Sequence, residues 1–400
     1  MNSLKSKYMT TAVLALVASA ALVACGGGSS SSTAALAPPA ATVNLPQVDA
    51  VVAASDAVVT SIGASLIAGA ADEEIYNVTA DIGDSWQLVF NNKTNTYVTK
   101  VLSTQFGLTQ SASAAFTKTT VGTTTSIKDA GGTALSVQID TRTRTLSGKV
   151  TLGAKTATVA GSGYAVTDTS KLAGTYFYGG STRDLSGANR SADLGSFTLA
   201  ANGDVVLCEG GIFAGSSCVK PVDSTSLPTK ALKVTRDSSG LLRVKDPSNL
   251  DFGALHVSSG DRGAILVLDR FGKDASGISR TGVIFASKAS VKLAGTEFNG
   301  TWVCSVGGKD VVQVVATDST LSLTDLELNK PAAAGTLSYN KVVTGLGSAS
   351  AREITLDGVI SAKNNGEAVG ESVVILPLSS SLAIVVEPID NIVDVCRKKS

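Results

Sequence analysis

The feature that most constrains this chain is a two-residue period of apolar and polar side chains, which begins near Ile75 and recurs to the end. Residues 133–139 and 145–152 show it on both sides of a polar turn, and residues 86–90 and 96–102 show it around residues 91–95. The pair Asn202-Gly203 is a strong hairpin signal. Alternation of this kind turns one face of a strand inward and the other outward, as in antiparallel sheet. We therefore predict an all-β fold.

One helix is expected before the strands. The apolar side chains of residues 48–66 stand at positions 48, 51, 52, 58, 59, 62 and 66, and no proline interrupts them. This is the spacing of an amphipathic helix. We predict one short helix here, ending near Gly69.

A short internal repeat indicates that the sheet is divided into modules. Residues 171–179 read Lys-Leu-Ala-Gly-Thr-Tyr-Phe-Tyr-Gly, and residues 292–300 read Lys-Leu-Ala-Gly-Thr-Glu-Phe-Asn-Gly, so that seven of nine positions are identical. We interpret the copies as the openings of two homologous modules. The predicted fold is a series of tandem antiparallel β-barrel or sandwich-like modules. The predicted units are 47–170 (the helix plus a first β-unit), 171–290 and 291–400.

Each copy of the repeat is expected to begin an equivalent strand. Leu172 and Phe177 of the first copy, and the matching Leu293 and Phe298, should both point inward. Because these residues are five apart, strict alternation would place them on opposite faces. We therefore expect a bulge or bend at the glycine between them.

The first 46 residues have the layout of an export signal and a tether. The basic residues Lys5 and Lys7 precede an apolar run over residues 11–24 that is too short to span a bilayer. Leu22-Val23-Ala24-Cys25 resembles the lipobox of bacterial lipoproteins. The resemblance implies a signal peptide over residues 1–24 and acyl chains on Cys25, which would attach the protein to a membrane. Residues 25–46, rich in Gly, Ser, Ala and Pro, then predict a flexible linker.

The residue after the cysteine indicates which membrane. In the lipoprotein class, aspartate at this position favours the inner membrane, whereas this chain has Gly26. The resemblance thus implies an outer-membrane protein that is lipid-anchored and either periplasmic or surface-exposed.

Four further cysteines suit an oxidising compartment. Cys208, Cys218, Cys304 and Cys396 allow three pairings, of which we favour Cys208–Cys218 and Cys304–Cys396. A metal site is the alternative. The chain has no Cys-x-x-Cys and a single histidine, which favours disulfides over a metal.

Charge and motifs argue against several functions. Lys and Arg together number 33, as do Asp and Glu, and no basic stripe is present, so nucleic acid is not an expected partner. A Ser-His-Asp set would depend on His256, which alternates within an expected strand. Ser217-x-x-Lys220 and Ser338-x-x-Lys341 lack the companion motifs of penicillin-recognising enzymes. No cofactor motif is present, so we predict a non-enzymatic protein without a cofactor.

The sequence Asn299-Gly-Thr-Trp302 resembles the Gly-x-Trp motif that opens the first strand of lipocalins. In that family the tryptophan closes the base of an eight-stranded barrel that holds a small apolar ligand, and Trp302 is the candidate ligand-site residue by this resemblance. The alternative is a tryptophan that caps a barrel filled by side chains.

Three functions follow from these patterns. The first is a structural or binding role in the cell envelope, with an envelope protein, a glycan or a small hydrophobic ligand as partner. The second is a lipocalin-like binder of small hydrophobic ligands. The third is a polysaccharide-acting surface enzyme, because two carboxylates could converge in space.

Overall fold

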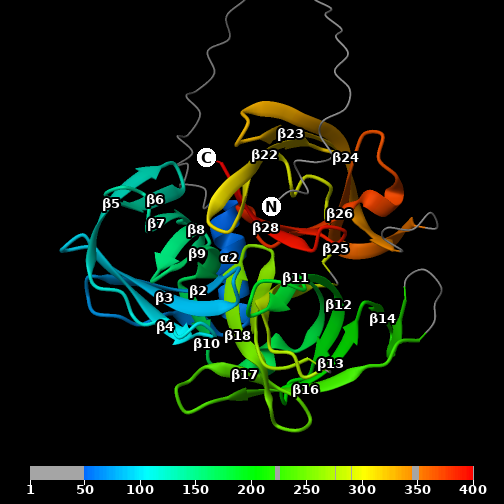
Figure 1. Ribbon diagram of the computed structural model, residues 1–400, viewed down its shortest axis with the longest axis horizontal. Helices are drawn as coiled ribbons and strands as arrows, with labels where there is room; N and C mark the ends of the chain where they lie inside the picture. The colour runs from blue at the N-terminus through cyan, green and yellow to red at the C-terminus, as the bar shows by residue number, and fades with distance from the viewer. Residues whose placement is uncertain (1–48, 221–225, 275, 290, 345–350, 400) are drawn as a thin grey trace, which may run out of the picture. The chain divides into compact units, whose positions relative to one another are not determined.

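Closed antiparallel barrels make up most of the chain (Figure 1). The computed structural model describes residues 49–220, 226–274, 276–289, 291–344 and 351–399. Over this part the chain forms one α-helix and three barrels of eight strands each. The prediction of an all-β chain of tandem barrel modules after one short helix is confirmed. The expected signal peptide, Cys25 and the whole of the expected linker lie outside the described residues.

The helix α2 (Ala50–Ser61) is shorter than predicted at its carboxyl end. Gly63 has a φ of 62°, a left-handed conformation that commonly ends helices at glycine. The next residues form strand β1 (Ala64–Leu66), which pairs with β10 (Tyr164–Val166). The predicted extension of the helix to residue 66 is therefore wrong.

Barrel 1 is an up-and-down barrel in which each strand pairs with the next and β2 closes on β9. Both hairpins expected from the alternation are present, as β3 with β4 and β7 with β8. In β7, Leu135, Val137 and Ile139 are buried while Ser136 and Gln138 are half-buried, as a period of two requires. The strands are β2 (Glu73–Ala80), β3 (Asp84–Asn91), β4 (Thr96–Ser103), β5 (Ala114–Val121), β6 (Thr124–Asp129), β7 (Leu135–Asp140), β8 (Thr145–Leu152) and β9 (Lys155–Ser162).

Barrel 2 follows the 3₁₀ helix η1 (Thr169–Leu172) and closes by pairing of its first and last strands. A separate hairpin, β14 (Ile212–Ala214) with β15 (Ser217–Val219), is inserted between its third and fourth strands. The barrel strands are β11 (Gly174–Asp184), β12 (Ser191–Leu199), β13 (Asp204–Glu209), β16 (Lys230–Arg236), β17 (Leu242–Lys245), β18 (Asp251–Gly260), β19 (Gly263–Arg270) and β20 (Arg280–Lys288).

Barrel 3 repeats the up-and-down order, with its first strand paired to its last. A 3₁₀ helix, η2 (Val369–Glu371), precedes the sixth strand. The strands are β21 (Gly300–Val306), β22 (Lys309–Thr317), β23 (Thr320–Asp325), β24 (Lys330–Thr344), β25 (Arg352–Asn364), β26 (Val373–Pro377), β27 (Leu382–Glu387) and β28 (Ile392–Lys398).

The outer faces of barrels 2 and 3 pack against each other. Ile265 and Val267 of β19 belong to a buried cluster with Ile384 and Val386 of β27. Leu266, between them, points into barrel 2. Strands buried on both faces carry unbroken apolar runs, which explains why alternation is lost in β19 and β27.

The repeat prediction is wrong in its register, although the tandem barrels are present. Residues 174–180 lie in β11, whereas residues 292–299 precede β21. Leu172, Leu293, Phe177 and Phe298 are all buried. However, Phe177 faces the contact between barrels 2 and 3, because the period of two turns Tyr176 and Tyr178 inward instead.

The true equivalence is Gly174-Thr-Tyr176 with Gly300-Thr-Trp302, which opens both barrels. Tyr176 Oη donates to the Leu172 carbonyl at 2.7 Å, and Trp302 Nε1 donates to the Phe298 carbonyl at 2.8 Å. Each aromatic residue is paired across the barrel closure with a lysine, Lys288 or Lys398. In both barrels the aromatic residue of the Gly-Thr-aromatic opening thus donates the same hydrogen bond, to the backbone carbonyl four residues earlier.

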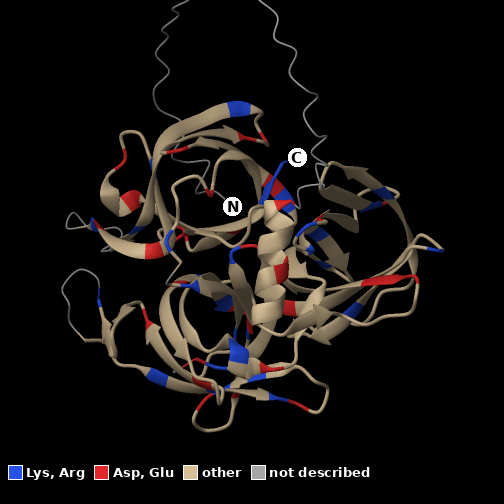
Figure 2. Cartoon of the chain, turned by 180° about the vertical axis from the view of Figure 1, so that it is seen from behind, with Lys and Arg blue, Asp and Glu red and all other residues tan. Residues whose placement is uncertain are grey.

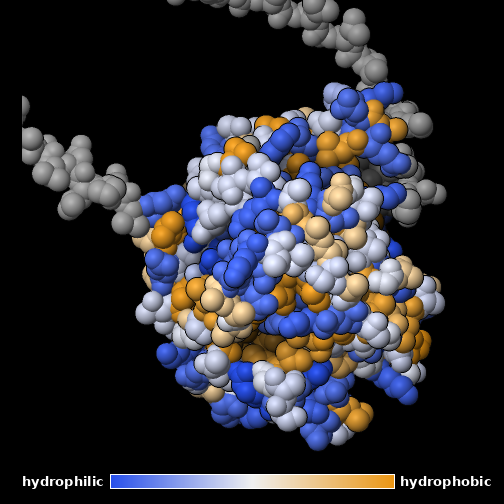
Figure 3. Space-filling view, turned by 90° about the vertical axis from the view of Figure 1, so that its left-hand side faces the viewer, coloured by the Kyte–Doolittle hydropathy of each residue, from blue (hydrophilic) through white to orange (hydrophobic). Residues whose placement is uncertain are grey.

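Charges of both signs are interspersed over the barrels. In the view from behind, Lys and Arg alternate with Asp and Glu without a continuous stripe of either (Figure 2). Another face shows hydrophilic and hydrophobic residues side by side, with hydrophobic residues gathered around a hollow in its lower half (Figure 3).

Candidate functional site

Barrel 2 contains a cavity of about 770 Å³. Its lining comes from all eight strands of this barrel and from the turns at one end. Ligand pockets in proteins are typically about 300–1,000 Å³. The cavity is therefore large enough for a small organic molecule.

The wall of the cavity is mainly apolar. Several of its side chains belong to the buried core of the barrel, as Leu199, Val205 and Leu266 do. Other apolar side chains line the cavity but are only half-buried, because they face the empty space: Phe197, Leu207, Leu232, Phe252, Leu268 and Ile284. Apolar surface is thus exposed inside the barrel.

Polarity changes along the length of the cavity. Tyr178 lies four residues from Thr182 on β11, a distance of about 13 Å along the strand. The register pairs Tyr178 with Ala286 and Thr182 with Gly282, so that Arg280 lies at the Thr182 end. Asp193 and Arg270 also line the cavity and interact electrostatically with each other and with Arg280. The cavity therefore has an apolar interior and a charged end.

Barrels 1 and 3 have large side chains where barrel 2 has space. Barrel 1 is filled by an aromatic group in which Phe90 makes edge-on contacts with Tyr76 and Phe116, at centroid distances of 6.1 and 5.5 Å. In barrel 3, Phe298 stacks on Trp302 at 4.7 Å. Eight strands leave an interior that side chains can fill or a small ligand can occupy.

Trp302, the candidate from the lipocalin resemblance, lies fully buried inside barrel 3. The cavity is lined by barrel 2 residues instead. The corresponding aromatic residue in barrel 2 is Tyr176, which stacks on Phe197 at 5.1 Å. Because Phe197 lines the cavity, Tyr176 supports its apolar end.

Both predicted disulfides are present. Cys208 is bonded to Cys218, and Cys304 is bonded to Cys396. The first joins β13 to the inserted hairpin, directly beside Glu209 of the cavity lining. The second joins the first and last strands of barrel 3.

The only histidine lies in a buried contact between barrels 1 and 2. Ser85 Oγ of β3 is 2.7 Å from His256 Nε2 of β18, and the same hydroxyl donates to Asp269 Oδ2 of β19 at 2.7 Å. Ser85 and Asp269 are fully buried and His256 is 9% exposed. Burial lowers the pKa of His256 to about 4 and raises that of Asp269 to about 7.

This cluster does not have the geometry of a catalytic triad. In a triad the carboxylate holds the histidine, and the histidine activates the serine. Here Ser85 lies between His256 and Asp269, and it has no exposed surface for a substrate to approach. The arrangement bonds the buried Ser85 hydroxyl to both of its neighbours and joins two barrels.

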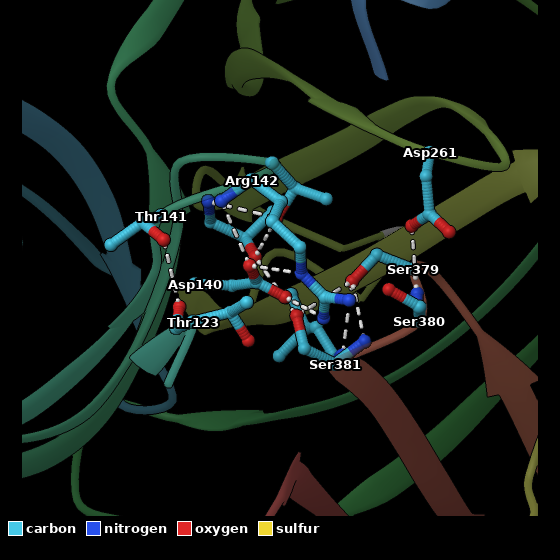
Figure 4. Close-up of polar contacts among 11 residues, drawn as sticks. Thr123, Asp140, Thr141, Arg142, Asp261, Ser379, Ser380 and Ser381 are labelled. Atoms are coloured by element: carbon cyan, nitrogen blue, oxygen red, sulfur yellow. Dashed lines mark hydrogen bonds and ion pairs between the residues drawn. The ribbon is translucent and has the colours of Figure 1, made fainter. Parts of the chain in front are cut away.

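Turns of all three barrels meet in a second polar cluster (Figure 4). Arg142 donates to the Asp140 carboxylate at 3.0 and 2.8 Å. Asp261 of barrel 2 accepts the backbone N–H of Ser380 of barrel 3 at 2.7 Å, and Ser381 lies 3.4 Å from Thr145. Burial raises the pKa of Asp140, but its bonds with Arg142 outweigh this and hold it below the ordinary value.

The two Ser-x-x-Lys matches lie away from the cavity. Ser217 and Lys220 are exposed at the inserted hairpin. Ser338 and Lys341 lie on β24, where Lys341 Nζ donates to Thr355 Oγ1 at 3.4 Å. Neither match lines the cavity.

The described part of the chain has neither a candidate metal site nor a helix that could span a membrane. Among these residues, no cluster of three or more His, Cys, Asp or Glu side chains has the geometry to hold a metal ion. The same residues contain no helix with the length and hydropathy needed to cross a membrane.

Sequence reasoning missed Asp193, Arg270 and Arg280. A signal was present, because each of these charged residues continues an inward-facing series of apolar positions or glycines. Arg270 stands two residues after Leu268, and Arg280 four before Ile284. A charge on the inner face of a barrel strand indicates a polar lining.

Comparisons with known proteins assign no relative to this chain. No protein-family model matches it. No curated protein and no solved structure matches it significantly.

Proposed function

We propose that this protein is a lipid-anchored envelope protein that binds a small, mostly apolar ligand inside barrel 2. The observation that carries the proposal is the cavity of about 770 Å³ with half-buried apolar side chains on its wall. Of the functions expected from the sequence, this is the binder of small hydrophobic ligands.

The energetic argument rests on the apolar surface of the cavity. Removing apolar surface from water contributes about 25 cal/mol per Å². Phe197, Leu232 and Ile284 retain exposed surface that no protein side chain covers. An apolar ligand covers this surface without rearrangement of the strands, because hydrogen bonds between neighbouring strands already hold the barrel closed.

The filled barrels support a structural role beside the binding role. Barrel 3 packs on barrel 2 through a shared apolar cluster, and barrel 1 contributes the buried Ser85 contact. These contacts hold the wall of barrel 2 from outside. A wall held in this way keeps a cavity open instead of collapsing into it.

The anchoring part of the proposal rests on the sequence. Leu22-Val23-Ala24-Cys25 provides the acylation site, and several acyl chains on one cysteine bind a membrane almost permanently. Residues 25–46 would then separate the barrels from the lipid.

The binding proposal is tested with N-phenyl-1-naphthylamine, a fluorescent apolar probe, added to the mature protein. We expect saturable fluorescence enhancement with one site per chain. Ile284→Trp places a larger side chain in the cavity and should weaken probe binding at least tenfold. Val315→Trp is the matched control, because Val315 is 41% exposed on barrel 3. Equal binding by both variants would show that the probe does not enter barrel 2.

A further inference from the structure

The charged end of the cavity contains equal numbers of basic and acidic residues, but they differ in how they are bonded. The basic residues are Lys230, Arg270, Lys273 and Arg280, and the acidic residues are Asp193, Glu209, Asp246 and Asp274. Formal charge therefore cancels. Which charge is available to a ligand depends on the partners that each group already has.

Three of the four carboxylates are engaged by the protein itself. Glu209 forms an ion pair with Lys230. Asp246 accepts the backbone N–H groups of Ser248 and Leu250, each at 2.9 Å, within its own turn. Asp274 accepts those of Ser276 and Ile278 at 2.9 and 3.0 Å in the same way. Such bonds satisfy the hydrogen-bonding capacity of a carboxylate within its own turn, although they leave its charge in place.

The fourth carboxyl group, Asp193, lies deeper in the barrel. Its burial raises its pKa, as does the nearby Glu209 carboxylate, while Thr182, Arg280 and Arg270 act in the opposite direction. No ion pair joins Asp193 to an arginine among the described residues. Asp193 therefore lies within the electrostatic field of both arginines without a bond to either guanidinium.

The two arginines keep their positive charge without a bonded counter-ion. Arg270, 6% exposed, donates from Nη1 to the Phe252 carbonyl at 2.9 Å and to the Phe271 carbonyl, and its guanidinium lies 3.8 Å from the centroid of the Phe252 ring. Carbonyl oxygens orient a guanidinium but do not neutralise it. Arg280 Nη2 donates to Thr182 Oγ1 at 3.1 Å. Neither guanidinium forms an ion pair within the described part of the chain.

A buried positive charge of this kind is costly until an anion accompanies it. The burial lowers the pKa of Arg270 to about 10, which still leaves it charged at neutral pH. One end of the cavity therefore has two guanidinium groups that no carboxylate bonds, and the rest of the cavity has apolar side chains that no protein group covers.

We propose that barrel 2 binds a single-chain amphiphile whose oxyanion head, a carboxylate or a phosphate, lies between Arg270 and Arg280 while its hydrocarbon chain lies against the apolar wall. This inference rests on the proposed function. It adds the chemical class of the ligand and its orientation, with the head at the Thr182 end and the chain directed toward Tyr178. Guanidinium groups suit such heads, because they can donate two parallel hydrogen bonds.

The test compares ligands that share a twelve-carbon chain and differ only in the head. Dodecanoate, dodecyl phosphate, dodecanol and dodecyltrimethylammonium are titrated into the mature protein by calorimetry, below their micellar concentrations. We expect at least one of the two anions to bind at least tenfold more tightly than dodecanol, and the cation to bind more weakly than dodecanol. The anion that binds more tightly shows whether the natural ligand has a carboxylate or a phosphate head.

Variants then assign the effect to the arginines. Arg280→Gln should weaken anion binding about tenfold and dodecanol binding much less, because the hydroxyl head carries no charge, whereas Arg280→Lys should retain part of the preference. Arg280 is chosen first because it is less buried than Arg270. Arg236→Gln is the control, because Arg236 donates to backbone carbonyls of Val166, Thr167 and Gly240.

The outcomes separate the two proposals. If dodecanol binds as tightly as both anions, or if the cation binds more tightly than they do, the anionic head is refuted and the apolar cavity stands. If Arg280→Gln weakens dodecanol and the anions alike, the head assignment is also refuted. If neither the amphiphiles nor the naphthylamine probe binds, the proposed function itself fails.

Discussion

The Ser85 hydroxyl oxygen lies 2.7 Å from Nε2 of His256 and thereby links barrel 1 to barrel 2. The residues are 171 positions apart, and both are buried. A hydrogen bond of this kind is expensive to break, because it leaves a buried polar group without a partner. The contact also makes the stability of the protein sensitive to pH.

Burial lowers the pKa of His256 from 6.5 to about 4, so the unfolded chain binds a proton more readily than the folded chain between these values. Stability should therefore fall as pH decreases from about 6.5 to about 4, by on the order of 3 kcal/mol from this residue. His256→Gln should remove that loss. The measurement is urea unfolding of both proteins from pH 4 to 8, and a constant difference between them would contradict the expectation.

Asp269 provides the opposite slope and serves as the companion variant. Burial raises its pKa from 3.8 to about 7, so the folded chain binds a proton more readily than the unfolded chain between these values. The contribution of Asp269 to the free energy of unfolding therefore falls as pH rises through this range. Asp269→Asn should make the protein relatively more stable toward pH 7. Relative to the parent protein, His256→Gln should thus gain stability as pH falls toward 4, and Asp269→Asn should gain stability as pH rises toward 7.

A glycine between barrels 1 and 2 should resist substitution. A Cβ at Gly83 would lie 2.2 Å from the Gly282 backbone nitrogen and 2.2 Å from Thr281 Oγ1. Gly122 has a similar positive φ and open space around it, so it is the matched control. We expect Gly83→Ala to cost about 2 kcal/mol more than Gly122→Ala, because overpacking adds to the backbone strain that both share. Thermal unfolding measures the difference, and equal losses would disprove the close contact.

The Gly-Thr-aromatic openings should contribute similarly to their barrels. Trp302→Phe and Tyr176→Phe each leave a buried carbonyl, of Phe298 or Leu172, without its side-chain donor. We expect each to lower the free energy of unfolding by about 1–3 kcal/mol. Tyr97→Phe is the control, since its hydroxyl has no hydrogen bond among the described residues. A change no larger than the control would show that these bonds are not stabilising.

The two disulfides should differ in their contribution. Cys304–Cys396 closes a separation of 92 residues and Cys208–Cys218 one of 10. Chain entropy then assigns about 4.6 and 2.7 kcal/mol to them. Paired Cys→Ala variants of each bridge should lose stability in that order in urea, and the reverse order would contradict the estimate.

The presence of both disulfides is tested by mass spectrometry. The intact mass without reductant should be four hydrogens below that of the reduced protein.

The lipid anchor is tested separately from the barrels. Cys25→Ser removes the acylation site and should move the protein from the membrane fraction to the soluble fraction. Ligand binding by barrel 2 should not change, because the linker separates the two. If the variant still sediments with membranes at high salt, the interpretation of residues 22–25 is wrong.

The register of the repeat shows the limit of sequence comparison. Seven identical residues align 171–179 with 292–300, yet the strands begin at Gly174 and Gly300. Only the shorter match, Gly-Thr followed by an aromatic residue, coincides with the strand openings. This shorter match matters because each aromatic side chain donates a hydrogen bond to the carbonyl four residues earlier, and a sequence alignment does not show hydrogen bonds.

The sequence by itself determined the strand class and the hairpins, because these depend on local period and on turn residues. It limited the four cysteines to three pairings, and the structure decided among them. Only the tertiary structure decided which barrel is hollow and where the barrels touch. The period of two sorts Leu266 from Ile265, but it does not say that one lines barrel 2 and the other meets barrel 3. Whether the inward-facing side chains of eight strands fill a barrel depends on their total volume. These side chains come from strands that are distant in sequence, and they meet only when the barrel closes.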